Sequence, residues 1–230
     1  MSDPSTTLEE QPPSLITFTG FLMGLFVVDM MTVRAGLAPL YHQIGGLLLE
    51  HDANQQIWDD RIKACPDFQD SPFSREQKIE VNANQTGALM SYLGMLRLQS
   101  STAALTIINH IDTGTRRTAG IAGVDIKRMR GGPEKSKISM LEMIRATGDW
   151  SRHHFQWNDA TTTWPAQTLR NLGFKLNDPL LPARVIASLE FKTFLEFETS
   201  VIESVRATVR SWNLQKDPPS DLDERLSRAF

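Results

Sequence analysis

Hydrophobic residues recur at helical spacing along most of the chain. From Arg75 to Ile111 there is no proline, and apolar side chains return every three or four residues, which places them on one face of a helix. The same spacing runs from Ala183 to about Leu214. Alternation with period two, which is typical of half-buried strands, is rare. The pattern therefore predicts an all-α fold, an up-and-down bundle of four to five long helices.

Turn-forming residues mark the predicted helix ends. Ser14 is placed to cap a first helix that extends to about Glu50, with a kink or break at Gly36 to Pro39. Residues 51–74 should form a loop with a short helical piece. Asp112 to Gly114 should end the second helix, and residues 113–137, which hold five glycines, should form a flexible connection. Further helices are predicted over 137–157, 164–173, 183–214 and within the last twelve residues.

The composition predicts one domain with polar ends. Residues 1–14 are polar and proline-rich, which indicates a disordered N-terminal tail. Residues 15–215 should form a single helical bundle domain, followed by a charged C-terminal tail over 216–230. Cys65 is the only cysteine, which excludes an internal disulfide and any multi-cysteine metal site. Since the sequence has no glycine-rich phosphate loop and no HExxH signature, we expect no metal and no cofactor.

The first apolar segment allows two interpretations. Leu15 to Val33 is almost long enough to span a bilayer and contains Gly20 and Gly24 at a spacing that packed membrane helices use. Its one charged residue, Asp29, would be costly in lipid. The N-terminal tail carries three acidic residues and no Lys or Arg, so it lacks the basic start of a secretory signal. We therefore predict a cytoplasmic protein in which this segment is a core helix or is buried in a dimer, with a membrane anchor as the alternative.

Positive charge is concentrated in one segment. The whole chain has a formal net charge of −3, so its overall charge does not attract nucleic acid. Residues 113–137 hold seven Lys or Arg against two acidic residues, a local balance of +5. An anion-binding role would have to come from such a local patch. The predicted anion-binding residues are Arg116, Arg117, Lys127, Arg128 and Arg130.

The following helix carries a candidate for acid–base chemistry. On a helical wheel of 137–157, Arg145, Asp149, Arg152 and His153 share the polar face, whereas His154 points into the apolar arc. Asp149 is one turn from His153 and can orient its imidazole for proton transfer. Two arginines on the same face can hold a phosphate. The alternative is an ordinary solvated face with an Arg145–Asp149 pair.

Residues 145–157 (RATGDWSRHHFQW) resemble a basic–aromatic–histidine helix of HEPN-like proteins. Those are bacterial helical bundles that often belong to toxin–antitoxin and phage-defence systems. The resemblance implies a metal-independent ribonuclease that acts on RNA as a homodimer. It implies that Arg145 stabilises the phosphate, that His153 is the acid or base, that Asp149 is the orienting group and that Arg152 is auxiliary.

A second class of function needs only the apolar faces. The chain would then be a non-catalytic helical module that dimerises or docks onto a protein partner, with membrane association through Leu15 to Val33 as a variant. Its mark would be an apolar patch left exposed when the bundle closes. We expect such a patch on Leu15–Val33 or Phe191–Phe197, and we do not expect a membrane partner.

Overall fold

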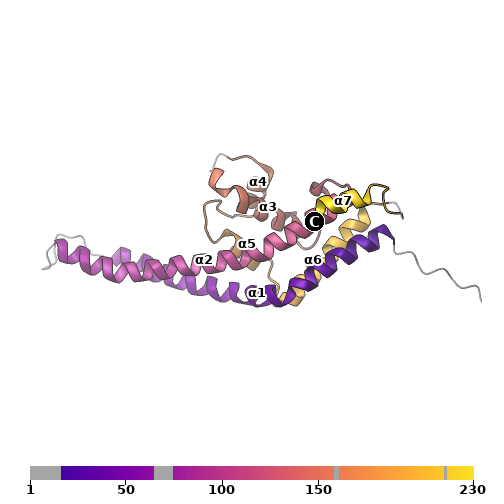
Figure 1. The fold of residues 1–230 in the computed structure, drawn as a ribbon. Helices are drawn as coiled ribbons and strands as arrows, with labels where there is room; N and C mark the ends of the chain where they lie inside the picture. Colours follow the sequence, from indigo (N-terminus) through magenta and orange to yellow (C-terminus); the bar gives the residue numbers. More distant parts are fainter. Residues whose placement is uncertain (1–16, 65–74, 158–160, 215–216) are drawn as a thin grey trace, which may run out of the picture.

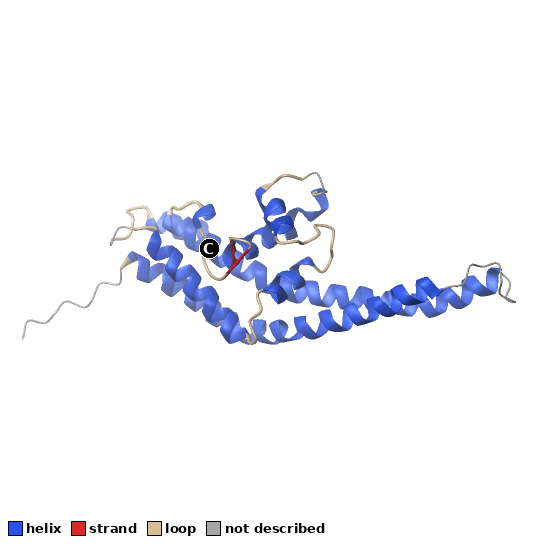
Figure 2. Ribbon diagram, turned by 180° about the vertical axis from the view of Figure 1, so that it is seen from behind, coloured by secondary structure: helices blue, strands red, loops and turns tan. Residues whose placement is uncertain are grey.

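The computed structural model describes residues 17–64, 75–157, 161–214 and 217–230, and this part of the chain is almost entirely helical (Figure 2). The all-α prediction is therefore confirmed. The α-helices are α1 (Phe18–Ala64), α2 (Arg75–Ala122), α3 (Met140–His153), α4 (Trp164–Asn171), α5 (Leu181–Ser188), α6 (Phe194–Ser211) and α7 (Leu222–Ala229). Two 3-10 turns, η1 (Ile126–Arg128) and η2 (His154–Gln156), and a two-residue antiparallel pair, β1 (Glu134–Lys135) with β2 (Ile138–Ser139), complete these elements.

The long helices α1 and α2 lie side by side and form the axis of the molecule (Figure 1). The shorter helices gather around one part of this pair, and the two long helices continue past α5 as a projecting hairpin. We call residues 40–60 of α1 and 87–106 of α2 the arm. The hydrophobic core lies where the pair meets α3 to α7, and it includes Phe26, Ile107, Ile144, Phe197 and Val205.

Helix α1 is continuous where the sequence predicted a loop. Pro39 lies inside it, and the helix bends in its middle without breaking (Figure 1). The loop predicted for 51–74 is wrong for 51–64, and residues 65–74 lie outside the described residues. Gln55 and Gln56 donate i,i+4 side-chain hydrogen bonds to Asp59 and Asp60, both at 2.9 Å. These local bonds favour helix in a stretch with little apolar periodicity.

Helix α2 continues through the predicted stop at Asp112 to Gly114. The hydroxyls of Thr115 and Thr118 donate to the carbonyls of Asp112 and Gly114 one turn earlier, so the threonines are accommodated within the helix. A Cβ on Gly114 would lie 3.1 Å from the ring of Phe26. The glycine thus serves close packing against α1, and the predicted flexible connection over 113–137 is wrong for 113–122.

The predicted helix over 183–214 is interrupted. It divides into α5 and α6 around Glu190, whose φ is +59°. Thr193 caps α6, because its hydroxyl accepts a hydrogen bond from the Glu196 backbone N–H at 3.1 Å. At the end of the chain, α7 packs on α2. The residues of α7, which were predicted to belong to a charged tail over 216–230, are therefore part of the folded body. The predicted N-terminal tail lies outside the described residues.

The first apolar segment is partly core and partly exposed. Leu22, Phe26 and Met30 are buried, whereas Val28 and Met31 are 63% and 56% exposed. By length and composition α1 could cross a membrane, and 28% of its most apolar stretch is buried inside the protein, so neither the core helix nor the membrane anchor predicted for this segment is decided. In the other predicted patch, Phe194 and Phe197 are buried, and Leu195 is exposed at 59%, so Phe191–Phe197 leaves one large apolar side chain at the surface.

An aromatic cluster joins α1 to α6. Tyr41 stacks on Phe197 with ring centroids 5.2 Å apart, and its hydroxyl donates to the Phe191 carbonyl at 3.0 Å. Burial raises the pKa of Tyr41 to about 12. Because the folded state favours the neutral phenol, Tyr41 stabilises the fold below its unfolded pKa. That contribution is lost as the pH rises from about 10 through 12.

Tyr41→Phe should change the alkaline stability profile. At pH 7 the variant should be about 1 kcal/mol less stable, because the hydrogen bond to the Phe191 carbonyl is lost. As the pH rises above about 10, the difference in stability between wild type and variant should shrink, because the Tyr41 phenol ionises more readily in the unfolded state. Phenylalanine has no ionisable group and shows no such effect. Urea unfolding of both proteins at a series of alkaline pH values checks this. A free-energy difference that stays constant with pH would contradict it.

Candidate anion-binding site

The buried carboxylate of Asp112 is the centre of a polar cluster between α2 and α3. Its side chain is fully buried, and Oδ2 accepts hydrogen bonds from Arg116 Nε at 2.9 Å and Arg152 Nη2 at 2.8 Å. Both guanidinium groups also bind Asp149 Oδ1, at 2.9 Å from Arg116 and 2.7 Å from Arg152. Two carboxylates and two guanidinium groups therefore form a closed ring in which the charges cancel.

Each member of this ring depends on the others. Burial alone would lower the pKa of Arg152, but its hydrogen bonds to Asp149 and Asp112 outweigh that effect and raise it. Asp112 Oδ1 is buried without a hydrogen-bond partner among the described residues. A carboxylate in that position is stable only while both guanidinium groups contact its other oxygen.

Gly148 allows α3 to approach this carboxylate. A Cβ at residue 148 would lie 2.8 Å from Asp112 Oδ2 and 3.0 Å from its Cγ. A contact of 2.8 Å is shorter than any carbon–oxygen contact that a folded protein tolerates without a shift. The small residue at this position therefore sets the separation of α2 and α3.

Beside the ring lies a hollow of about 400 Å³ between α2 and α7, which we call the arginine hollow. Four arginines line it, two from each helix, and no carboxylate is among its lining residues in the described part of the chain. The lining residues are Thr113, Arg116, Arg117, Gly120, Arg225, Arg228 and Ala229. The structure thus brings together Arg116 and Arg117, which were predicted from the sequence, and two further arginines, Arg225 and Arg228, which were not predicted.

Acidic side chains and backbone carbonyls hold these arginines in place. Arg117 Nε donates to the Ala229 carbonyl at 3.3 Å, and its Nη1 lies 3.5 Å from Asp29 Oδ1. Arg225 donates to Asp221 at 2.9 Å and to the Ile121 carbonyl at 3.3 Å. Arg228 pairs with Glu224 and is 75% exposed.

Gly123 makes room for one of these guanidinium groups. It adopts a φ of +68°, and a Cβ there would lie 2.2 Å from Arg225 Nη1. Only glycine fits this position without displacing the arginine.

Arg145 does not lie on an accessible face, contrary to the helical-wheel prediction. It is 4% exposed, its Nη1 donates to the Ile126 carbonyl, and its guanidinium lies 4.2 Å from the ring centroid of Trp164. Burial lowers its pKa. The predicted pair with Asp149 is replaced by the bonds of Asp149 to Arg116 and Arg152. Arg145 therefore stabilises the packing of α3 and is not placed to bind a phosphate.

The histidines at the end of α3 are exposed. His153 lies at the end of the helix, and no hydrogen bond or ion pair joins it to another described residue. His154 is exposed as well, stacked on Trp150 with ring centroids 4.6 Å apart, so its predicted place in the core is wrong. Of the four predicted catalytic residues, the structure brings together Asp149 and Arg152 only.

The rest of the predicted basic patch lies outside the hollow. Lys127 and Arg128 form the exposed turn η1, and Arg130 pairs with Glu142 at 3.2 Å. None of the three lines the arginine hollow. No group of three or more His, Cys, Asp or Glu side chains in the described ranges could hold a metal ion.

Sequence reasoning missed Asp112, Arg225 and Arg228. Asp112 was interpreted as a helix end because Thr113 and Gly114 follow it. For α7, a usable signal was present, because Asp221–Arg225 and Glu224–Arg228 are acid–base pairs at i,i+4 spacing. Such pairs indicate a helix, but they do not indicate which face of the protein the helix covers.

Gly148→Ala should destabilise the protein by about 1–3 kcal/mol, because the added methyl group forces α3 away from Asp112. Gly36→Ala is the matched control, since a Cβ there meets nothing within 4 Å. We expect that variant to be unchanged or more stable by about 0.5–1 kcal/mol. Urea unfolding measures both. Equal effects of the two substitutions would show that α3 does not press on Asp112.

Comparisons with known proteins add no relative. No family model matches the chain, and neither a curated protein nor a solved structure matches it. The HEPN-like resemblance of residues 145–157 therefore stays a prediction from those residues. A function for this chain must come from the chemistry of its own surfaces.

Proposed function

We propose that the chain binds RNA without cleaving it, and that the arginine hollow takes phosphate groups of the RNA backbone. The supporting observation is that four guanidinium groups from α2 and α7 surround one hollow whose lining includes no carboxylate. Guanidinium groups bind phosphate oxygens with paired, charge-assisted hydrogen bonds. The hollow, at about 400 Å³, has room for a phosphate together with water.

The arginines keep donors for such a ligand. In the contacts between described residues, Arg116 uses Nε and Nη2, and Arg117 uses Nε and Nη1. Each therefore keeps one terminal nitrogen free. Arg228 contributes only Nη2 to its pair with Glu224. A phosphate can be bound without breaking the pairs that hold the side chains.

An exposed aromatic segment follows Arg152 along the chain. Arg152 shares both of its carboxylate partners with Arg116, and it is followed directly by His153, His154 and Phe155. Phe155 is 74% exposed. Aromatic side chains beside a basic groove bind unpaired bases by stacking, whatever the base. The combination favours single-stranded RNA as the ligand.

Binding is better supported than cleavage. The HEPN-like interpretation needs Arg145 beside His153, but the Arg145 guanidinium is buried against the Ile126 carbonyl and Trp164. His153 has no described acidic partner to orient its imidazole. We therefore propose no acid–base step for this chain.

Arg228→Gln should weaken RNA binding. We expect the substitution to cost about 1 kcal/mol of binding free energy, which corresponds to an affinity about fivefold lower. The slope of log K against log salt concentration should fall by about 0.7, which is the value for one phosphate contact to a single strand. Fluorescence anisotropy of a labelled oligouridine over a salt series measures both, and Arg206→Gln, an exposed arginine of α6, is the control. Equal slopes for Arg228→Gln and wild type would exclude the arginine hollow as the RNA-binding site.

Phe155→Ala should weaken binding of the same oligouridine by about 1–3 kcal/mol, the usual contribution of one stacked base. Because Phe155 is 74% exposed, the thermal midpoint of unfolding should stay unchanged. Inorganic phosphate and vesicles of anionic lipid serve as competitors. If vesicles bind and oligouridine does not, the ligand class is wrong.

Gel electrophoresis of the RNA after incubation tests the absence of cleavage. It should show intact strands for wild type and His153→Ala alike. Cleavage by wild type alone would restore the ribonuclease interpretation.

A further inference from the structure

An apolar pocket of about 170 Å³ lies between α1, α2 and Phe230, beside the arginine hollow. Its walls include Phe26 and Ile121, which are buried. We call it the Asp29 pocket, after the one carboxylate among its lining residues in the described part of the chain. Arg117 lines both the pocket and the arginine hollow, so the two cavities adjoin at this side chain.

The Asp29 pocket has room for one six-membered ring. A cavity of about 150 Å³ holds a benzene molecule, whereas a purine has two fused rings and needs more space. Val28 and Phe230 also line the pocket and are 63% and 75% exposed, so the pocket opens to solvent. A flat ring can therefore enter the pocket while the rest of its molecule stays outside.

A carboxylate and a guanidinium group provide the polar chemistry of the pocket. Two other polar lining residues, Thr32 and Thr118, donate their hydroxyl groups to carbonyls one turn earlier in their own helices, at 2.8 and 2.9 Å. The remaining polar lining residues are Asp29 and Arg117. This acidic–basic pair is therefore the main element with which the pocket can recognise a ligand.

Asp29 accepts no short hydrogen bond from another described residue. Its Oδ1 lies 3.5 Å from Arg117 Nη1, and its Oδ2 lies 3.7 Å from His110 Nε2. Both distances exceed about 3.2 Å, the upper limit of ordinary N–H···O hydrogen bonds. His110 Nε2 is itself buried without a hydrogen-bond partner in the described part of the chain. The polar groups at the pocket thus keep capacity for hydrogen bonds that the fold does not use.

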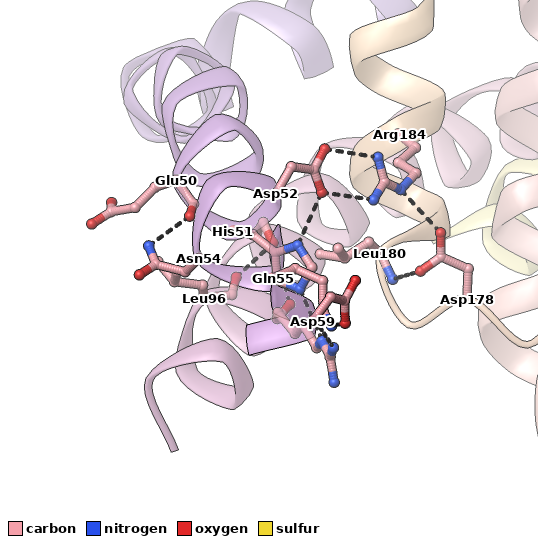
Figure 3. Close-up of polar contacts among 12 residues, drawn as sticks. Glu50, His51, Asp52, Asn54, Gln55, Asp59, Leu96, Asp178, Leu180 and Arg184 are labelled. Atoms are coloured by element: carbon pink, nitrogen blue, oxygen red, sulfur yellow. Dashed lines mark hydrogen bonds and ion pairs between the residues drawn. The ribbon is translucent and has the colours of Figure 1, made fainter. Parts of the chain in front are cut away.

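Asp52, a carboxylate of the same helix, is held much more closely. It accepts hydrogen bonds from Arg184 of α5 at 2.9 and 3.2 Å, and its Oδ1 lies 3.0 Å from His51 Nδ1 (Figure 3). The hydrogen bond from Arg184 lowers the pKa of Asp52. These contacts fix the arm to α5. Asp52 is thus engaged by the fold, whereas Asp29 can still accept hydrogen bonds from a ligand.

We infer that the Asp29 pocket binds a pyrimidine base of the RNA strand whose phosphate lies in the arginine hollow. This inference deepens the proposed RNA binding and rests on it. Asp29 and Arg117 present a hydrogen-bond acceptor beside a donor, and their charges cancel, which suits a neutral ring. The pairing edge of uracil or cytosine carries an N–H group next to an oxygen or nitrogen acceptor, so it can bind both side chains at once. The apolar walls then contact the faces of the ring.

Arg117 can serve the base and the phosphate together. Its Nη1 lies beside Asp29, and its Nη2 takes part in no hydrogen bond or ion pair with a described residue. Its Nε donates to the Ala229 carbonyl at 3.3 Å, and the centroid of the Phe230 ring lies 4.5 Å from the guanidinium carbon. These contacts hold the guanidinium group between the two cavities, where Nη1 reaches the base and Nη2 the phosphate.

Oligonucleotides with altered bases test the pocket on the wild type. Fluorescence anisotropy compares labelled oligouridine with oligoadenylate and with oligo(3-methyluridine) of the same length. Adenine is too large for the pocket, and 3-methyluracil lacks the N–H that donates to Asp29. We expect both to bind about tenfold more weakly than oligouridine, the usual loss for one hydrogen bond to a charged group. If no strand binds, RNA binding fails and the inference with it, whereas equal binding of all three strands overturns the inference alone.

Asp29→Leu should remove the preference for oligouridine. Leucine has a similar size but accepts no hydrogen bond, so oligouridine should bind about tenfold more weakly. Oligoadenylate should bind as before or more tightly, because a negative charge beside the arginines is lost. Asp223→Leu is the matched control, since this exposed carboxylate of α7 lines neither cavity, and it should keep the preference of the wild type.

Circular dichroism confirms the fold of both variants. An unchanged preference for oligouridine in folded Asp29→Leu overturns the inference. If Asp29→Leu does not fold, the comparison of oligouridine with oligo(3-methyluridine) on the wild type decides.

Discussion

The carboxylate of Asp112, buried between Arg116 and Arg152, is the interaction on which the rest of the site depends. Burial of a charge is costly unless paired charges and hydrogen bonds compensate for it, and removal of one partner is more damaging than loss of the whole group. Here the compensation comes from both helices, because Arg116 belongs to α2 and Arg152 to α3. Gly148 permits the close approach. The same pairing that sets the distance between the helices also fixes the Arg116 guanidinium at the edge of the arginine hollow.

Periodicity predicted the helices well and their ends poorly. An apolar repeat reports a face that will be buried, and that face exists in α2, α3 and α6. Gly114 was interpreted as a stop, yet it lies against Phe26 inside α2, because glycine serves close packing as well as turns. The break before α6 was missed, although Thr193 and Glu196 form the local capping pattern. The error arose because apolar residues on both sides hid the cap.

The candidate site was predicted in part, for a related reason. A helical wheel shows which residues share a face, but not what covers it. Arg145 shares the polar face of α3 with Asp149, yet the Ile126 carbonyl and Trp164 cover the Arg145 end, so its charge serves packing. Asp149 instead accepts bonds from Arg116, thirty-three residues earlier in the chain. Charge counting did identify Arg116 and Arg117, whereas the arginines of α7 became part of the site only through the packing of α7 on α2.

The charge arrangement also determines how a ligand is attracted. Around the hollow, Arg116, Arg117, Arg152, Arg225 and Arg228 are balanced by Asp29, Asp112, Asp149, Asp221 and Glu224. Five positive and five negative charges cancel at a distance, and the whole chain is slightly acidic. Long-range steering of an anionic ligand such as the proposed RNA is therefore weak. Attraction develops only within a few ångströms, where a phosphate can contact the guanidinium nitrogens that the carboxylates leave unbound. Affinity in such a site depends on contact geometry, so the anchoring bonds of Arg117 and Arg225 matter as much as their charge.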